Sequence, residues 1–178
     1  MNVLVTGFEP WGAETVNPSA HVARSLGGHV LPVHWSGATR RLKRLLAREK
    51  PKAVLMLGLG AGRRRLELEA VALNVDHCEE GPWKRSRRPI GKGGALALPS
   101  RLPLDRLLRL LRAAGVPAGL SHHAGTFLCN HVFYVALRAT RVPCGFIHLP
   151  PESVVALDDQ VKAVRRVVEA LAPRRGVR

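Results

Sequence analysis

The sequence lacks several features that would assign it to a specialised class of protein. No apolar run approaches the roughly 18 residues that a membrane-spanning helix needs. Segment 1–7 has neither the basic stretch nor the long apolar core of a signal peptide. The 3 cysteines lie far apart and form no Cys-x-x-Cys pair, which argues against a disulfide framework. These absences lead us to expect a cytoplasmic protein that does not bind membranes.

Motifs that hold common cofactors are also absent. The His-Cys pair at 77–78 and the His-His pair at 122–123 do not have the spacing of zinc ligands. Segment 58–62, GLGAG, is followed by Arg63 where a dinucleotide-binding loop has its third glycine, and a strand is expected after it rather than a helix. We therefore expect no metal and no other cofactor.

Acidic and aromatic residues are few. Lysine and arginine number 28 against 13 acidic residues, a formal net charge of +15, which favours a polyanion such as nucleic acid as a partner. Aromatic residues make up only 4% of the chain, and Trp83 is the one aromatic beside the basic runs 63–65 and 84–88. Without rings on which bases can stack, these runs are more typical of solvated surfaces. Nucleic-acid or polyanion binding is therefore kept as the alternative from a different functional class.

Short apolar segments alternate with amphipathic ones along most of the 178 residues. This alternation predicts an α/β fold, a single three-layer α/β/α sandwich around a mixed, largely parallel sheet. We expect the domain to span 1–172, a frayed tail at 173–178, and a long surface loop at 76–100 that holds at most a short hairpin. The expected strands are 3–6, 30–34, 53–57, 66–75, 118–121 and 145–149, and the expected helices are 18–26, 39–49, 103–114, 129–140 and 155–171.

Cys129 is the strongest candidate for a nucleophile. Segment 121–131, SHHAGTFLCNH, leaves a predicted strand and enters a predicted helix, so Cys129 is expected near the helix N-terminus. Free N–H groups and the positive end of the helix dipole stabilise a thiolate there and can hold an oxyanion. The alternative is a structural cysteine in the core. Cys78 and Cys144 lack this sequence context.

A thiol nucleophile needs a base, and His148 is the best placed histidine. It ends a predicted strand directly before a Leu-Pro-Pro turn, at the edge of the sheet where sites gather. His122 and His123 are adjacent, so both cannot face one site. His131 follows the candidate nucleophile by two helical positions and is expected to point away from it.

A carboxylate often orients such a base, and Glu69 is the candidate. It lies within the largely apolar strand 66–75, where a carboxylate must be either paired or solvated. The alternative is that Glu69 simply faces outward from an alternating strand. The residues alone leave both possibilities open.

Six blocks of sequence carry a resemblance to a known family. They are TGFEPWG at 6–12, NPS at 17–19, GLGAGR at 58–63, EAVALN at 69–74, AGTFLCNHVFY at 124–134 and GFIHLP at 145–150. Together and in this order they resemble pyroglutamyl peptidase I, also called pyrrolidone-carboxylate peptidase, a family of cytosolic cysteine peptidases. The blocks around the cysteine and the histidine are the most specific.

The resemblance implies that Glu69, Cys129 and His148 form a catalytic set without a cofactor. It also implies an α/β/α sandwich, a homo-oligomer (a tetramer or a dimer), and removal of pyroglutamate from the N-terminus of peptides. The residues that the resemblance places in the pocket for the pyroglutamyl ring are Phe8, Trp11, Asn17, Phe127 and Leu128.

The chain also departs from the family pattern. Leu59 stands where the family usually has a glutamine associated with the lactam, and Ala70 stands in place of an arginine. Glu79 and Glu80 fall where an arginine and an apolar residue are usual, and Trp11 replaces a phenylalanine. The three catalytic residues therefore match the family pattern more closely than the residues that recognise the substrate do. A divergent thiol amidase or hydrolase with another acyl specificity is the second hypothesis.

Overall fold

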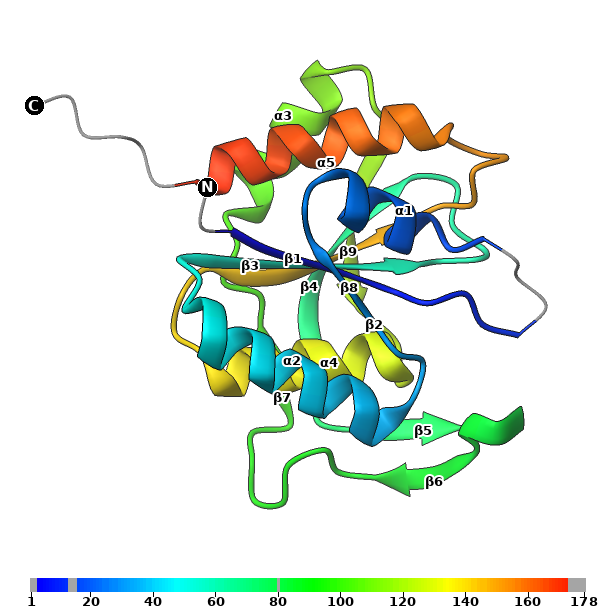
Figure 1. Cartoon of the computed structure of the whole chain (residues 1–178), viewed down its shortest axis with the longest axis vertical. Coiled ribbons are helices and arrows are strands. Elements are labelled where there is room, and N and C mark those ends of the chain that lie inside the picture. The colour runs from blue at the N-terminus through cyan, green and yellow to red at the C-terminus, as the bar shows by residue number, and fades with distance from the viewer. Residues whose placement is uncertain (1–2, 13–15, 80, 173–178) are drawn as a thin grey trace, which may run out of the picture.

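The computed structural model describes residues 3–12, 16–79 and 81–172. Its centre is a seven-stranded sheet in the order β2-β1-β3-β9-β4-β7, with β8 also paired to β4 (Figure 1). The predicted tail at 173–178 and Glu80 lie outside the described residues. The sheet strands are β1 (Val3–Phe8), β2 (His29–Leu31), β3 (Ala53–Leu59), β4 (Leu66–Leu73), β7 (Ala97–Pro99), β8 (Ala118–His123) and β9 (Cys144–Leu149).

The sheet is mixed and largely parallel, as the sequence predicts. Strands β2, β1, β3 and β9 run parallel to one another, and β8 runs parallel to β4. Strand β4 runs antiparallel to β9 and β7. The carboxyl end of β9 therefore meets the first half of β4, with His148 opposite Glu67 in the register.

Helices cover both faces of the sheet, which confirms the predicted three-layer α/β/α sandwich. One face is covered by α2 and α4, and the other by α1, α3 and α5 (Figure 1). Each helix turns an apolar stripe toward the sheet, and the two faces hold two separate hydrophobic clusters. The helices are α1 (Pro18–Ser25), α2 (Trp35–Glu49), α3 (Leu104–Ala113), α4 (Leu128–Ala139) and α5 (Leu157–Leu171).

The first helix begins at a strong local signal. The Asn17 side chain accepts a hydrogen bond from the Ser19 N–H at 3.0 Å, and Pro18 occupies the first helical turn. The helix ends before Gly27, whose φ of +71° is unfavourable for residues with a Cβ. Asn17 is 2% exposed, so the cap lies inside the molecule rather than on its surface.

Segment 76–100 is more ordered than a surface loop. Strands β5 (Asp76–Cys78) and β6 (Arg85–Arg88) form an antiparallel hairpin that encloses a short 3-10 turn (Gly81–Trp83). The hairpin lies beside α2 and α4 (Figure 1), and β7 then joins the edge of the main sheet. The sequence Arg-Ser-Arg-Arg gives β6 no apolar alternation, and this is why only a hairpin of uncertain extent could be expected.

Helix α2 also begins earlier than predicted, at Trp35 rather than at residue 39. The His34 ring accepts a hydrogen bond from the Gly37 N–H at 3.1 Å and caps the helix, a role that histidine seldom takes. No helix within 3–12, 16–79 and 81–172 has the length and apolarity needed to cross a membrane.

Candidate active site

The structure brings Cys129, His148 and Glu69 together on the sheet face that α2 and α4 cover. Cys129 is the second residue of α4, His148 lies near the carboxyl end of β9, and Glu69 lies in β4. Three elements that are distant in sequence thus meet at one edge of the sheet, where α/β proteins place their sites.

Glu69 does not face solvent, so the alternative of an outward-facing residue is wrong. Its side chain is 0% exposed, and Oε1 lies 2.6 Å from Nδ1 of His148. An ionised carboxylate only accepts hydrogen bonds, so Nδ1 of His148 is the donor. This bond fixes the ring and leaves Nε2 for the sulfur of Cys129.

His148 is an unusually strong base for a buried histidine. Burial alone would lower its pKa, but the charge on the Cys129 sulfur and hydrogen bonds to Cys129 and Glu69 outweigh the burial. Together they raise the pKa of His148 to about 9. A protonated imidazole beside the sulfur favours the thiolate, which is the nucleophilic form of cysteine.

The loop before α4 leaves the helix N-terminus open to a ligand. Gly125 has a φ of +78°, a turn conformation that favours glycine. Phe127 at the N-cap position makes no side-chain capping bond. The first N–H groups of α4 therefore have no side-chain acceptor at this cap and are available to a developing oxyanion beside Cys129.

Gly58 makes room for the sulfur. A Cβ at this position would lie 2.7 Å from Sγ of Cys129 and 2.8 Å from Cζ of Phe146, closer than real contacts allow. The glycine-rich segment that resembles an incomplete dinucleotide-binding loop thus has a different role, which is to let α4 approach the end of β3.

A cavity of about 220 Å³ opens beside Cys129 and His148. None of its lining residues is Asp, Glu, Lys or Arg, and most are apolar. Such a cavity suits a small uncharged group. The lining includes all five residues predicted for the pocket, Phe8, Trp11, Asn17, Phe127 and Leu128, together with Val33, Leu59 and residues 124–126.

The polar side chains of the cavity wall are held by the protein itself. The Asn17 amide donates to the Glu9 carbonyl at 3.1 Å and accepts from Ser19. The Thr126 hydroxyl donates to the His77 carbonyl at 3.2 Å. Both side chains are therefore fixed in place, and the wall is rigid as well as apolar.

Two tryptophans that the sequence analysis did not select support the aromatic wall. The ring of Trp11 lies 5.7 Å from that of Trp83 and 5.6 Å from that of Phe127, between ring centres. Trp83 Nε1 donates to the Val33 carbonyl at 2.7 Å, and Trp35 Nε1 donates to the Trp83 carbonyl at 3.1 Å. The turn between β5 and β6 thus packs the ring of Trp83 against the aromatic wall of the cavity.

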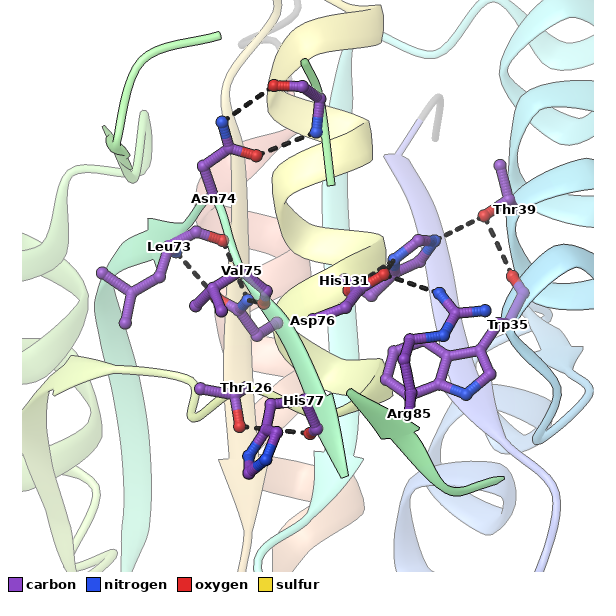
Figure 2. A network of polar contacts seen from close by, with 12 residues as sticks. Trp35, Thr39, Leu73, Asn74, Val75, Asp76, His77, Arg85, Thr126 and His131 are labelled. Carbon is purple, nitrogen blue, oxygen red and sulfur yellow. Dashed lines mark hydrogen bonds and ion pairs between the residues drawn. The ribbon is translucent and has the colours of Figure 1, made fainter. Parts of the chain in front are cut away.

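A buried polar network fixes this hairpin to the helices (Figure 2). Asp76 accepts from His131 Nδ1 at 2.8 Å and from Arg85 at 2.7 Å. Nε2 of His131 lies 2.6 Å from the Thr39 hydroxyl on α2. His131 therefore points away from Cys129, as predicted, and it ties α4 to both α2 and the hairpin.

The remaining histidine rivals do not reach the site. His122 and His123 are exposed and do not line the cavity. Within the part of the chain that the structure describes, no cluster of three or more His, Cys, Asp or Glu side chains could hold a metal ion.

Sequence reasoning missed one charged residue close to the catalytic candidates. Arg63 forms ion pairs with both Glu67 and Glu69. In the sequence it follows a glycine motif and belongs to a basic run and to a family block, but none of these marked it as a site residue. Its pairing depends on how the loop after β3 folds against β4, because β9 separates these two strands in the sheet.

Comparisons with known proteins show the family to which the chain belongs. A family model described as "Pyroglutamyl peptidase" matches residues 1–172. Pyrrolidone-carboxylate peptidase from Chromobacterium violaceum is 39% identical, over 94% of this chain and 90% of its own length. The same enzyme from Thermococcus kodakarensis is 36% identical, over 89% of this chain and 85% of its own length.

Solved structures give the same result. Pyrrolidone carboxyl peptidase from Thermus thermophilus superposes with a TM-score of 0.85 and 39% identity, covering 94% of this chain and 98% of its own. The enzyme from Thermococcus litoralis superposes with a TM-score of 0.89 and 31% identity, covering 94% and 91%. Both structures cover 94% of the chain and therefore share its fold.

Proposed function

Because the chain belongs to the pyroglutamyl peptidase family, we propose that it is a cysteine peptidase that removes an N-terminal pyroglutamyl group from peptides. The observation that carries the proposal is the hydrogen-bonded series Cys129–His148–Glu69 beside a cavity whose other lining residues are uncharged. No step requires a metal or cofactor.

The reaction begins with the thiolate of Cys129, which attacks the carbonyl carbon of the pyroglutamyl group. N–H groups at the start of α4 stabilise the negative charge that develops on the carbonyl oxygen. His148 then donates its proton to the leaving amine, the C–N bond breaks, and a thioester to Cys129 remains. His148 next takes a proton from water, which attacks the thioester and releases pyroglutamate.

Glu69 acts through His148 rather than on the substrate. Its hydrogen bond to Nδ1 keeps the ring in the orientation in which Nε2 faces the sulfur. Its negative charge also stabilises the imidazolium that pairs with the thiolate. Glu69 therefore contributes to kcat more than to substrate affinity.

The cavity supports a pyroglutamyl group as the acyl part of the substrate. Pyroglutamate is a small lactam without a free α-amine, so its site needs an apolar slot and no anion to hold an ammonium group. Phe8, Trp11 and Phe127 supply apolar surface, and Asn17 supplies a fixed polar group. Leu59 at the cavity makes the wall more apolar than the family pattern, and it is the observation that keeps another neutral acyl group as the second candidate.

A panel of fluorogenic aminoacyl amides tests the proposal. We expect release of the fluorophore from the pyroglutamyl amide and none from the prolyl, alanyl or glutamyl amides, with loss of activity after alkylation of Cys129. Release from another amide, with none from the pyroglutamyl amide, would reject the assigned substrate and favour the divergent thiol hydrolase.

Two further features are part of this proposal. We expect a homo-oligomer, a dimer or a tetramer, located in the cytoplasm. Light scattering coupled to size-exclusion chromatography measures the mass in solution, and a monomer at micromolar concentration would contradict the expected homo-oligomer.

The alternative of a different functional class is nucleic-acid or polyanion binding. A steep salt dependence of binding to duplex or single-stranded nucleic acid would support this alternative.

A further inference from the structure

A second charged group lies beside the catalytic carboxylate. Glu67 and Glu69 are two residues apart in β4, so their side chains point to the same face of the sheet. Glu67 is 8% exposed and Glu69 is 0% exposed. Two buried carboxylates on the same face of a strand repel each other unless a cation lies near them.

Arg63 is the cation that contacts both carboxylates. One of its nitrogens, Nη1, pairs with Oε2 of Glu67, and the other, Nη2, lies 3.6 Å from Oε1 of Glu69. Arg65 also approaches this pair, but it contacts only Glu67, at 3.3 Å from Nε to Oε1. The two arginines therefore differ in one respect, which is contact with Glu69.

The charged groups around Glu69 come from four parts of the fold. They are Arg63 in the loop between β3 and β4, Glu67 in β4, His148 in β9 and, beyond His148, Cys129 in α4. Oε1 of Glu69 receives both the His148 hydrogen bond and the Arg63 ion pair. Oε2 of Glu69 has no hydrogen-bond partner among the described residues. Arg63 thus offsets the negative charge of Glu69 at the same oxygen that accepts the His148 hydrogen bond.

The backbone holds Arg63 in this place. Its N–H donates to the Gly60 carbonyl at 2.9 Å, which closes a turn directly after β3. The side chain then passes over Gly60, where an added Cβ would lie 2.4 Å from Cγ of Arg63. Glycine at 60 therefore leaves the space through which the guanidinium reaches Glu69.

We propose that Arg63 is a positioning residue that holds the Glu69 carboxylate in place, so that Glu69 holds His148 against Cys129. The role in turnover rests on the proposed function. The effect on Cys129 does not, because the reactivity of the sulfur can be measured without any substrate.

The test is the pH profile of Cys129 alkylation by iodoacetamide, followed by mass spectrometry of the peptide that contains Cys129. In Arg63→Gln the pair of carboxylates loses its shared cation. The Glu69 side chain is then no longer held toward His148, and the unbalanced negative charge disfavours the thiolate of Cys129. Both effects move the acidic limb of the alkylation profile toward higher pH. The expected shift for the loss of one nearby unit charge is about one pH unit. Alkylation near neutral pH then falls roughly tenfold.

Three variants separate this role from a loss of structure. Arg65→Gln is the matched control and is expected to leave the profile and the rate within about twofold of the original chain. Arg63→Lys keeps the charge and is expected to restore part of the shift. Glu67→Gln added to Arg63→Gln removes the second carboxylate and is expected to bring the limb back toward its original position.

Equal shifts in Arg63→Gln and Arg65→Gln, or no shift in Arg63→Gln while its unfolding curve matches that of the original chain, would overturn the proposal. Turnover gives a second readout, in which Arg63→Gln lowers kcat and leaves KM within about twofold because Arg63 does not line the cavity. If the alkylation profile shifts as expected but no pyroglutamyl amide is cleaved, the proposed substrate fails while the role of Arg63 holds. If the pyroglutamyl amide is cleaved while the alkylation profile stays unshifted, the proposed substrate holds and the role of Arg63 fails.

Discussion

The two sides of the candidate site are built in different ways. On the sheet side, Glu69 and His148 are buried charged groups on neighbouring strands, and a hydrogen bond of 2.6 Å joins them. On the opposite side, Trp11 and Phe127 form an apolar wall that Trp83 supports, and the hairpin that carries Trp83 is attached to the helices by Asp76. The sheet side is suited to make the sulfur reactive, and the aromatic side is suited to select the acyl group.

This difference means that the two sides can be changed separately. Substitutions on the sheet side should lower kcat and alter the pH dependence, whereas substitutions on the aromatic side should raise KM. A variant that changes kcat and KM by the same factor would indicate that the two sides of the site are coupled.

The largest effect is expected for the nucleophile itself. Cys129→Ser should reduce turnover by ~10⁴-fold or more, because a serine hydroxyl is a much poorer nucleophile in a site built around a thiolate. Steady-state kinetics measures the loss, and circular dichroism should show an unchanged fold. Cys78→Ser is the matched control, since Cys78 does not line the cavity, and it should keep its turnover. Retained turnover in Cys129→Ser would contradict the mechanism.

His148→Ala should lose turnover to a similar extent and should likewise keep its fold, as measured by the same kinetics and circular dichroism.

Glu69→Gln tests the sheet side without removing a reacting atom. The amide keeps the shape but loses the charge that helps to raise the pKa of His148. We expect kcat to fall by ~10²–10³-fold with KM nearly unchanged, so that a measurable activity is left. The alkaline limb of the pH profile should move to lower pH. An unchanged alkaline limb would show that Glu69 does not set the pKa of His148.

The alkaline limb of the original chain should lie near the pKa of His148, about 9. As the pH rises through this value the imidazolium loses its proton, and both the partner of the thiolate and the proton donor for the leaving amine are lost. Above the limb the rate should fall about tenfold for each pH unit. Turnover measured in overlapping buffers gives the curve, and a rate that continues to rise beyond it would contradict the assignment.

The raised pKa of His148 also makes the stability of the folded state depend on pH. The folded-state pKa of His148 lies above the ordinary value of 6.5, so the interactions that raise it stabilise the folded state fully below pH 6.5. They are lost as the pH rises through about 9. Chemical denaturation of the original chain across this range should therefore show a decline in stability that is smaller in Cys129→Ser.

The smallest of these effects is expected on the aromatic side. Trp83→Ala removes the edge contact to Trp11 and the hydrogen bond to Val33, so the wall loses its support from the hairpin. We expect KM to rise by roughly tenfold, with kcat changing less. Trp83→Phe keeps a ring in the same place and should restore most of the affinity. A fall in kcat without a change in KM would place Trp83 outside the substrate wall.

Local patterns predicted much of the fold and the position of Cys129 at the start of a helix. Alternating apolar segments predicted the layered α/β architecture, and Asn17-Pro18 predicted the start of α1, because these signals act within a few residues. The small residues before Cys129 indicated a helix N-terminus at the carboxyl end of a strand, and the structure places Cys129 in the first turn of α4.

Other features could not be read from local patterns. Glu69 was equally compatible with a solvated and a paired carboxylate, since the choice depends on which strands flank β4. Trp83 lies in a segment that carries no strand-like alternation, and its contacts with Trp11 and Val33 join segments that are far apart in the chain. Arg63 is close in sequence to Glu67 and Glu69, but no pattern in the sequence indicated that the loop after β3 brings its side chain to both carboxylates.

The sequence by itself determined which chemical groups this protein has to use: a cysteine at a helix start, a histidine at a strand end and a carboxylate within an apolar strand. It also determined the alternation that makes strands and helices stack in layers. Only the tertiary structure decided that His148 and Glu69, which are 79 residues apart, share a hydrogen bond in the interior and that Arg63 joins them. The physical reason is that burial and charge pairing depend on strand order and register, and these are set by the packing of the whole sheet rather than by any one segment.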